Sequence, residues 1–164
     1  MTSPAPDVPV DRRDAPAQLQ WLVDRALISD LMLTFARALD ERDWDAYAAT
    51  YTEDGVLNIG GFVELRGREA IRAATASPRG LGGYSGTWHG SSNHAITVSG
   101  DSATLHSYLL GVHMLSDSTR DHADGAGWYD CELVRTSDGW RFTHVKISEV
   151  WHAGGQLKHV PPPA

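Results

Sequence analysis

Three polar residues stand at positions where an unpaired polar group is unfavourable, and all three could take part in proton transfer. His89 and His113 each fall on a predicted strand face whose other members are mostly small or apolar. A polar ring in such surroundings needs a hydrogen bond, whether structural or functional. Asp40 follows an apolar helix pattern at its C-terminus, where a carboxylate opposes the helix dipole, so it is either a turn former or a functional group. Histidine is the natural proton acceptor near neutral pH, so proton abstraction is the chemistry that these residues could support.

The elements that precede and include Asp40 carry helical patterns. Apolar residues recur at spacings of three to five, which predicts an amphipathic helix over residues 16–40. Asp43 is predicted as the N-cap of a second helix over residues 44–50. A third helix is predicted over residues 68–75.

The elements that carry the two histidines are strands. Strands are predicted over residues 56–59, 62–65, 87–98, 103–115, 127–135 and 140–151. The helices come first in the sequence and an antiparallel meander comes last, which predicts an α+β fold. In this fold a curved antiparallel sheet is expected to wrap around the N-terminal helices as a cone. A β-bulge in the strand over 87–98 could switch its parity, and the glycine-rich loop over 77–86 is a candidate lid for a pocket between sheet and helices.

The bulk properties indicate one ordinary globular domain. The chain has 164 residues, of which 41% are hydrophobic and 21% charged, which suits a single core. Residues 1–15 are rich in proline and charge and are predicted to be a flexible arm. The domain is predicted over residues 16–152, followed by an irregular proline-rich tail over residues 153–164.

Charge and composition argue against several classes of function. A net charge of -7 without a basic cluster argues against a nucleic-acid partner. No apolar run is long enough to span a membrane and the N-terminus lacks the core of a secretion signal, so we expect a cytoplasmic protein without a membrane partner. Cys131 is the only cysteine, which excludes a disulfide within the chain. The histidines lack metal-binding spacings, so no metal and no cofactor is expected.

Several stretches occur in an order and spacing that are characteristic in combination. They are a helix end and turn at residues 35–45, a strand start at 89–93 with a turn at 100–103, a hairpin at 138–142, and Trp151 near the end of the last strand. This combination resembles the nuclear transport factor 2-like superfamily and, more narrowly, its SnoaL-like branch. That branch includes scytalone dehydratase, bile-acid dehydratase and hexachlorocyclohexane dehydrochlorinase.

The resemblance covers roughly residues 20–152 and implies a cone fold with a pocket between sheet and helices. In the dehydratases, an aspartate at the end of the first helix pairs with a histidine on the sheet, and Asp40 and His89 match these positions. His113 matches a second pocket histidine, and Asp130 matches an asparagine on the third strand. The pocket tyrosines of scytalone dehydratase have no counterparts here, which implies a different substrate.

These matches imply a cofactor-independent lyase or isomerase that acts on a small, cyclic or polyketide-like molecule as a dehydratase, double-bond isomerase or cyclase. His89 is expected to remove a proton next to an activating group, and Asp40 to orient it. His113 is expected to donate a hydrogen bond or proton to a departing hydroxyl or a developing oxyanion. Further substrate-binding candidates are Asp130, Asn58, Ser107, Trp88, Trp128 and Tyr84.

Two other readings stay open. An epoxide hydrolase or cyclase needs a carboxylate and amide set that positions water, of which Asp40 with Asn58 or Asp130 supplies fragments. A non-catalytic ligand-binding module is the other, since fold does not decide function. By resemblance we also expect a homodimer or a higher homo-oligomer.

Overall fold

A computed structural model describes residues 14–155 of the chain. Its elements are α1 (Ala15–Glu41), α2 (Trp44–Ala49), β1 (Tyr51–Ile59), β2 (Val63–Arg66), α3 (Arg68–Ala76), the 3-10 helix η1 (Leu81–Gly83), β3 (Gly86–Ser99), β4 (Ser102–Met114), β5 (His122–Thr136) and β6 (Gly139–Gly154). Helices dominate the first half and long strands the second, so the predicted α+β class is confirmed. Most of the predicted arm and tail, residues 1–13 and 156–164, lies outside the described residues. None of the helices within residues 14–155 is long and apolar enough to cross a membrane.

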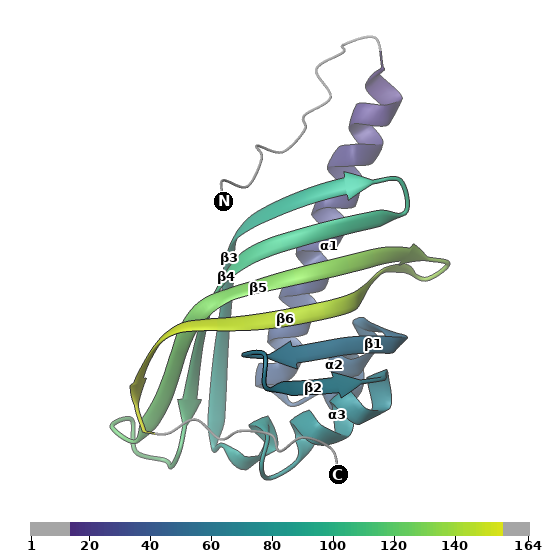
Figure 1. The fold of residues 1–164 in the computed structure, drawn as a ribbon. Coiled ribbons are helices and arrows are strands. Elements are labelled where there is room, and N and C mark those ends of the chain that lie inside the picture. The colour runs from purple at the N-terminus through teal and green to yellow at the C-terminus, as the bar shows by residue number, and fades with distance from the viewer. Residues whose placement is uncertain (1–13, 156–164) are drawn as a thin grey trace.

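The six strands form one open sheet in the order β2-β1-β6-β5-β4-β3. Its long strands bend sharply, and α1 lies against one face of the sheet (Figure 1). The predicted antiparallel meander is present in β3 to β6, but the sheet as a whole is mixed, because β1 and β6 pair in parallel. Short turns join β3 to β6 in succession and enforce antiparallel pairing there, whereas no turn links β1 to β6.

Three strands extend well beyond their predicted bounds, by more than a single residue. The sequence predicted a short strand from Val56, but β1 begins at Tyr51. The loop predicted up to residue 126 ends early, because β5 begins at His122, where it pairs with Met114 of β4. Likewise β6 continues to Gly154, into the predicted tail. Polar and glycine residues join these strands because an existing neighbour supplies the hydrogen-bond ladder, which local propensity does not report.

A bulge in β3 sets which side chains face α1. The register with β4 shifts between Ser92 and Ala95, and Asn93 takes a positive φ of 56° within the shift. The parity switch that the sequence left open is therefore present. It turns both His89 and His94 toward α1, where the His94 ring contacts the Ser29 hydroxyl at 2.8 Å.

The C-terminus of α1 positions both Asp40 and the predicted lid. Arg42 takes the left-handed conformation at φ 60° and ends the helix through bonds to carbonyls of the last turn. Its guanidinium then binds the backbone carbonyls of Leu81 and Tyr84. In this structure the glycine-rich loop is therefore held against the helix end, and the Tyr84 side chain is buried.

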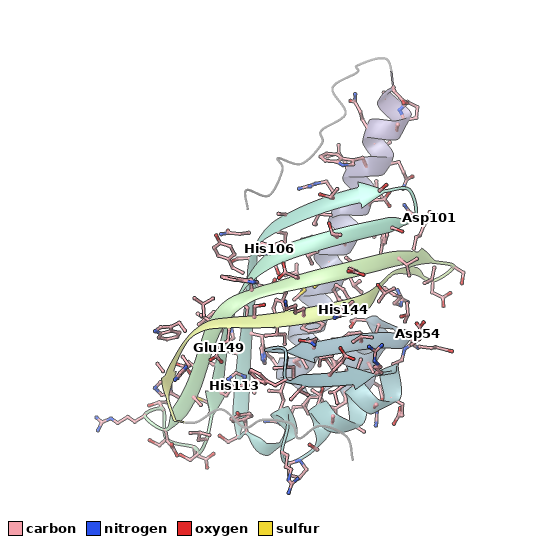
Figure 2. The ribbon with its side chains drawn as sticks, in the orientation of Figure 1. Asp54, Asp101, His106, His113, His144 and Glu149 are labelled. Atoms are coloured by element: carbon pink, nitrogen blue, oxygen red, sulfur yellow. The ribbon has the colours of Figure 1, made fainter. Side chains whose placement is uncertain are left out.

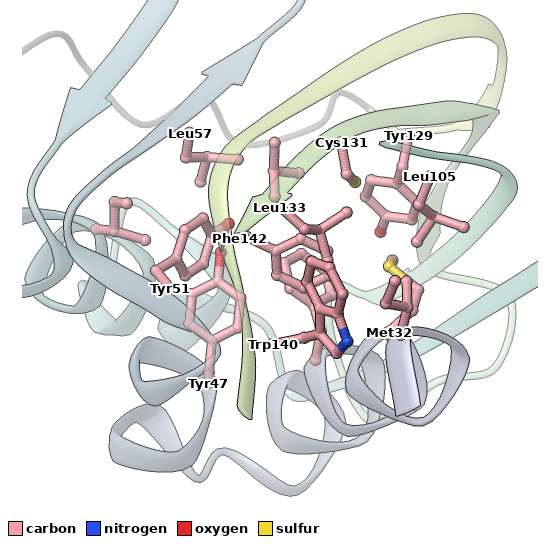
Figure 3. Packing of buried hydrophobic residues seen from close by; sticks show 14 of the residues in the cluster. Met32, Tyr47, Tyr51, Leu57, Leu105, Tyr129, Cys131, Leu133, Trp140 and Phe142 are labelled. Carbon is pink, nitrogen blue, oxygen red and sulfur yellow. Dashed lines mark hydrogen bonds between the residues drawn. The ribbon is translucent and has the colours of Figure 1, made fainter. Parts of the chain in front are cut away.

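An aromatic cluster fills the space between α1 and the sheet. The Phe35 ring makes edge contacts with Tyr47 at 5.0 Å, Tyr129 at 5.5 Å and Phe142 at 5.7 Å between centroids. Figure 3 shows Tyr47, Tyr129 and Phe142 within this packed core. Such contacts add to the hydrophobic gain of burying each ring, so the cluster forms a rigid floor for the cavity described below.

Candidate active site

Asp40 and His89 form a tight pair between the end of α1 and β3. The His89 Nδ1 lies 2.7 Å from Asp40 Oδ1, and the His89 backbone N–H donates to Oδ2 at 2.8 Å. The Thr87 hydroxyl donates a further bond to Oδ1 at 3.1 Å. Helix and strand thus hold the carboxylate from several directions, and the His89 side chain is only 7% exposed.

The surroundings keep Asp40 ionised. Burial raises the pKa of its carboxyl, but hydrogen bonds from the His89 side chain, the His89 backbone and Thr87 outweigh burial and leave the pKa below its usual value. The carboxylate also borders a polar groove between α1 and β3. An ionised carboxylate only accepts hydrogen bonds, so the neutral form of His89 carries its proton on Nδ1 and a lone pair on Nε2.

His113 presents a second imidazole beside His89. The two ring centroids lie 5.2 Å apart at an interplanar angle of 79°. Gly111 makes this approach possible, because a Cβ there would lie 3.0 Å from Cε1 of His113 and 3.5 Å from Cδ2 of His89. The His113 Nδ1 donates to the carbonyl of Ala123 at 2.9 Å, which leaves Nε2 of the neutral ring as an acceptor.

We expect nuclear magnetic resonance to find His113 neutral and protonated on Nδ1 near neutral pH. Burial lowers its pKa, and the neighbouring His89 lowers the pKa further. Imidazole 15N shifts report the tautomer directly, and the signals that disappear in His113→Gln identify the ring. A proton on Nε2 would contradict the assignment.

The lowered pKa of His113 also predicts how the stability of the protein changes at acid pH. A folded-state pKa below the unfolded value of about 6.5 means that the unfolded chain binds the proton first. The folded state is therefore destabilised as the pH falls below about 6.5, and His113→Gln should flatten that part of the profile in urea titrations. An unchanged acid profile in this variant would show that His113 does not titrate as its burial implies.

Both histidines line a cavity of about 210 Å³ between the sheet and the helices. Most of its wall is apolar and includes Phe35, Leu39, Leu57, Ile59, Leu109 and Ile147. Among the described lining residues, none is lysine or arginine, and Glu149 is the one carboxylate. Figure 2 shows Glu149 and His113 on the strongly bent parts of β6 and β4. A mainly apolar pocket with a few convergent polar groups is typical of a small-molecule site.

Of the expected substrate-binding residues, Tyr84 lines this cavity, with its ring centroid 4.9 Å from that of His113. Ser107 faces inward but is fully buried and accepts a hydrogen bond from Ser91 at 3.0 Å, away from the cavity wall. Asn58 accepts the backbone N–H of Gly61 at 3.0 Å and so stabilises its own turn. Neither side chain is available to a substrate in this structure.

Asp130, Trp88 and Trp128 lie on the opposite, outer face of the sheet. The Asp130 carboxylate contacts the exposed His106 ring at 2.7 Å, and the Trp88 side chain is 55% exposed. The expectation that they contact a substrate in the cavity is therefore corrected. Strand alternation explains this, because Trp128 and Asp130 alternate with the inward Tyr129 and Cys131 on β5, and Trp88 directly precedes the inward His89 on β3.

Tyr129 and Glu149 are among the cavity residues that the sequence reasoning missed. The alternation of Tyr129 with Cys131 on β5 was a usable signal for the inward face. For Glu149 the signal was hidden, because a register shift in β5 and β6 close to Gly127 changes the parity there.

Within residues 14–155, no group of three or more histidine, cysteine or acidic side chains could hold a metal ion. The two neighbouring histidines instead bind Asp40 and a backbone carbonyl through their Nδ1 atoms.

Comparison with known structures finds the same architecture in enzymes and in proteins without a stated activity. A candidate aromatic ring hydroxylase of Novosphingobium aromaticivorans is 29% identical, with a TM-score of 0.74 over 82% of this chain and 94% of that one. A candidate scytalone dehydratase of the same organism is 24% identical, with a TM-score of 0.75 over 86% and 93%. A hexachlorocyclohexane dehydrochlorinase is 22% identical, with a TM-score of 0.69 over 88% and 97%. The latter two likenesses concern the fold.

The curved open sheet, the helices on one face and the cavity between them define a nuclear transport factor 2-like protein with a cystatin-like fold. Residues 20–146 match the SnoaL-like domain, and the chain belongs to this family. An uncharacterized protein of Mycobacterium tuberculosis is 26% identical over 118 residues, which cover 72% of this chain and 80% of that protein.

Proposed function

We propose that this protein is a cofactor-independent lyase or isomerase, in which His89 removes a proton from carbon next to a carbonyl group. The observation that carries the proposal is the His89 ring, which binds Asp40 through Nδ1 and lines an apolar cavity. A buried base with its tautomer held by an ionised carboxylate is arranged for general base catalysis. The family and the folds of a dehydratase and a dehydrochlorinase support this class of reaction.

In a dehydration, the proton taken from carbon moves to His89 Nε2, and the electron pair of the C–H bond forms the new double bond. The protonated His89 can then return its proton to the departing hydroxyl, which leaves as water. Ionised Asp40 stabilises the imidazolium between these two steps. Neutral His113 accepts a hydrogen bond from the substrate hydroxyl and so orients it, which differs from the donor role expected from the sequence.

The proposal is tested by deuterium incorporation. The protein is incubated in heavy water with cyclic ketones, β-hydroxy ketones and enones, and exchange next to the carbonyl is followed by nuclear magnetic resonance. We expect exchange above the buffer rate for at least one uncharged member of the panel. A complete lack of exchange across the panel would favour the ligand-binding alternative.

The epoxide alternative is less well supported, because the residues that it requires are not assembled. Asn58 is engaged in its own turn and Asp130 lies on the outer face of the sheet. The homodimer stays part of the proposal, supported by exposed aromatic side chains on that outer face, since such patches often mark interfaces.

We further expect the cavity to prefer uncharged ligands. Glu149 lines it with a side chain that is 42% exposed, and its carboxylate repels an anion that enters. Glu149→Gln should raise the affinity for 2-naphthoate about fivefold at low salt, which corresponds to about 1 kcal/mol for a like charge nearby, and leave 2-naphthol unchanged. Naphthyl fluorescence titration measures both. The matched control is Glu132→Gln, an exposed strand carboxylate outside the cavity, and an equal gain in that variant would assign the effect to net charge alone.

A further inference from the structure

Tyr129 is a buried cavity residue whose hydroxyl is unused by the fold. Its side chain is only 2% exposed, and its hydroxyl has no hydrogen-bond partner among residues 14–155. The neighbouring Tyr47 and Tyr51 show the contrast, because their hydroxyls lie 3.2 Å apart and bond to each other. A hydroxyl that borders a cavity without a protein partner is available to a ligand in that cavity.

The Tyr129 ring is well placed beside the candidate catalytic pair. It stands on β5 opposite Ser107 of β4 and lines the same cavity as His89. Its edge contact with Phe35 holds the ring, and Figure 3 shows it projecting from the sheet toward α1, the helix that carries Asp40. Burial raises the pKa of Tyr129 well above its usual value, and nearby groups including Asp40 add to the rise. The hydroxyl therefore keeps its proton and acts as a donor.

The two histidines of the cavity leave a role for such a donor. In their neutral forms, His89 and His113 both present acceptor lone pairs on Nε2. Loss of a proton from carbon next to a carbonyl moves negative charge onto the carbonyl oxygen, which a hydrogen-bond donor stabilises.

We propose that the Tyr129 hydroxyl donates a hydrogen bond to the carbonyl oxygen of the substrate while His89 takes the proton from the adjacent carbon. This rests on the proposed function. The proton passes to His89 Nε2, the electron pair of the C–H bond enters the carbon–carbon bond, and the carbonyl oxygen gains the charge. Tyr129 keeps its proton and lowers the energy of that oxyanion.

A binding experiment tests the contact without turnover. The probe is 1-tetralone labelled with 13C at the carbonyl, added to wild type, Tyr129→Phe and Tyr47→Phe. We expect the bound carbonyl to keep a hydrogen-bonded chemical shift in wild type and in Tyr47→Phe, the matched control from the same cavity. In Tyr129→Phe the shift should move toward its value in hexane, and the affinity should fall about fivefold.

Rate and stability separate a substrate contact from a structural role. Exchange next to the carbonyl should fall about 100-fold in Tyr129→Phe, as expected for loss of one oxyanion donor, with an unchanged or higher melting temperature. An unchanged carbonyl shift in Tyr129→Phe would overturn the inference, as would failure of the wild type to bind the ketone. A lower melting temperature of Tyr129→Phe would also overturn it, because it would mean that the hydroxyl makes a stabilising bond within the protein. Exchange that persists equally in Tyr129→Phe rejects Tyr129 and leaves the proposed function intact. If the carbonyl shift depends on Tyr129 but the wild type catalyses no exchange, the contact between Tyr129 and the ketone is supported and the proposed function is rejected.

Discussion

Replacing His89 by alanine should abolish proton exchange on any ketone that the wild type accepts, with a loss of about 10³- to 10⁴-fold. The reason is that no other ring in the cavity combines an ionised carboxylate partner with a free Nε2. The neutral His113 ring binds only a backbone carbonyl through its Nδ1, so it lacks the charge that stabilises an imidazolium.

Asp40→Asn should also reduce exchange strongly while leaving the shape of the site intact. An asparagine amide can donate to His89 Nδ1, which moves the ring proton to Nε2 and removes the base. We therefore expect a loss of about 10²-fold or more, and 15N shifts of His89 should show the reversed tautomer.

The chain offers a matched control for both variants. His106 and Asp130 form a second pair with the same 2.7 Å contact, but on the outer face of the sheet. His106→Ala and Asp130→Asn should keep the wild-type rate. Equal losses in the two pairs would mean that the variants act through stability, and a fully active His89→Ala would refute the assignment of the base.

The largest effect on stability is expected for the ion pair of Asp24, a residue that is not among the described lining residues of the cavity. Its carboxylate is only 4% exposed and receives Arg135 Nη1 at 2.6 Å and Nη2 at 2.8 Å. Trp140 Nε1 and Gln20 Nε2 donate to the same carboxylate, each at 3.2 Å. The ion pair thereby joins the first half of α1 to the end of β5, beside the hairpin that leads into β6.

Arg135→Met should lower the free energy of unfolding by about 2–4 kcal/mol, because it leaves a buried carboxylate without its cation. Urea denaturation measures the loss. Arg66→Met is the control, since Arg66 forms an exposed pair with Glu64 that should contribute less than about 1 kcal/mol. The double variant Asp24→Asn with Arg135→Met should recover part of the loss, and strict additivity would contradict the coupling.

The Asp24 pair also predicts the direction of the pH dependence. The hydrogen bonds from Arg135 are the largest cause that lowers the pKa of Asp24 below its ordinary value. Its contribution is therefore fully present above the unfolded pKa of about 3.9 and is lost as the pH falls through the lower folded pKa. The difference in stability between wild type and Arg135→Met should shrink over that acid range, and a constant difference would argue against this linkage.

The sequence by itself determined the class of fold and the order of elements. Period-three-to-four apolar spacing predicted α1, and Asp43 marked the start of α2 as its N-cap. Alternation and turn residues predicted β3 to β6 as antiparallel neighbours. These signals are local, because each depends on residues a few positions apart, and local patterns survive without knowledge of the partners.

The candidate pair could be named from the sequence only through the family resemblance, since Asp40 and His89 lie 49 positions apart. Their contact depends on the left-handed end of α1 and on the placement of β3, which are tertiary features. The same applies to His113, because its role as an acceptor follows from its hydrogen bond to the Ala123 carbonyl on the neighbouring strand.

Tertiary structure alone decided the remaining members of the site and the direction of β1. Asp130 was assigned to the pocket through the resemblance and Trp128 from its residue type, but the inner face of β5 belongs to Tyr129. Alternation divides a strand into two faces without saying which one meets the helices, and bulges reassign the faces partway along. The parallel pairing of β1 with β6 is likewise a long-range contact that no turn specifies, so packing of the whole domain selected it.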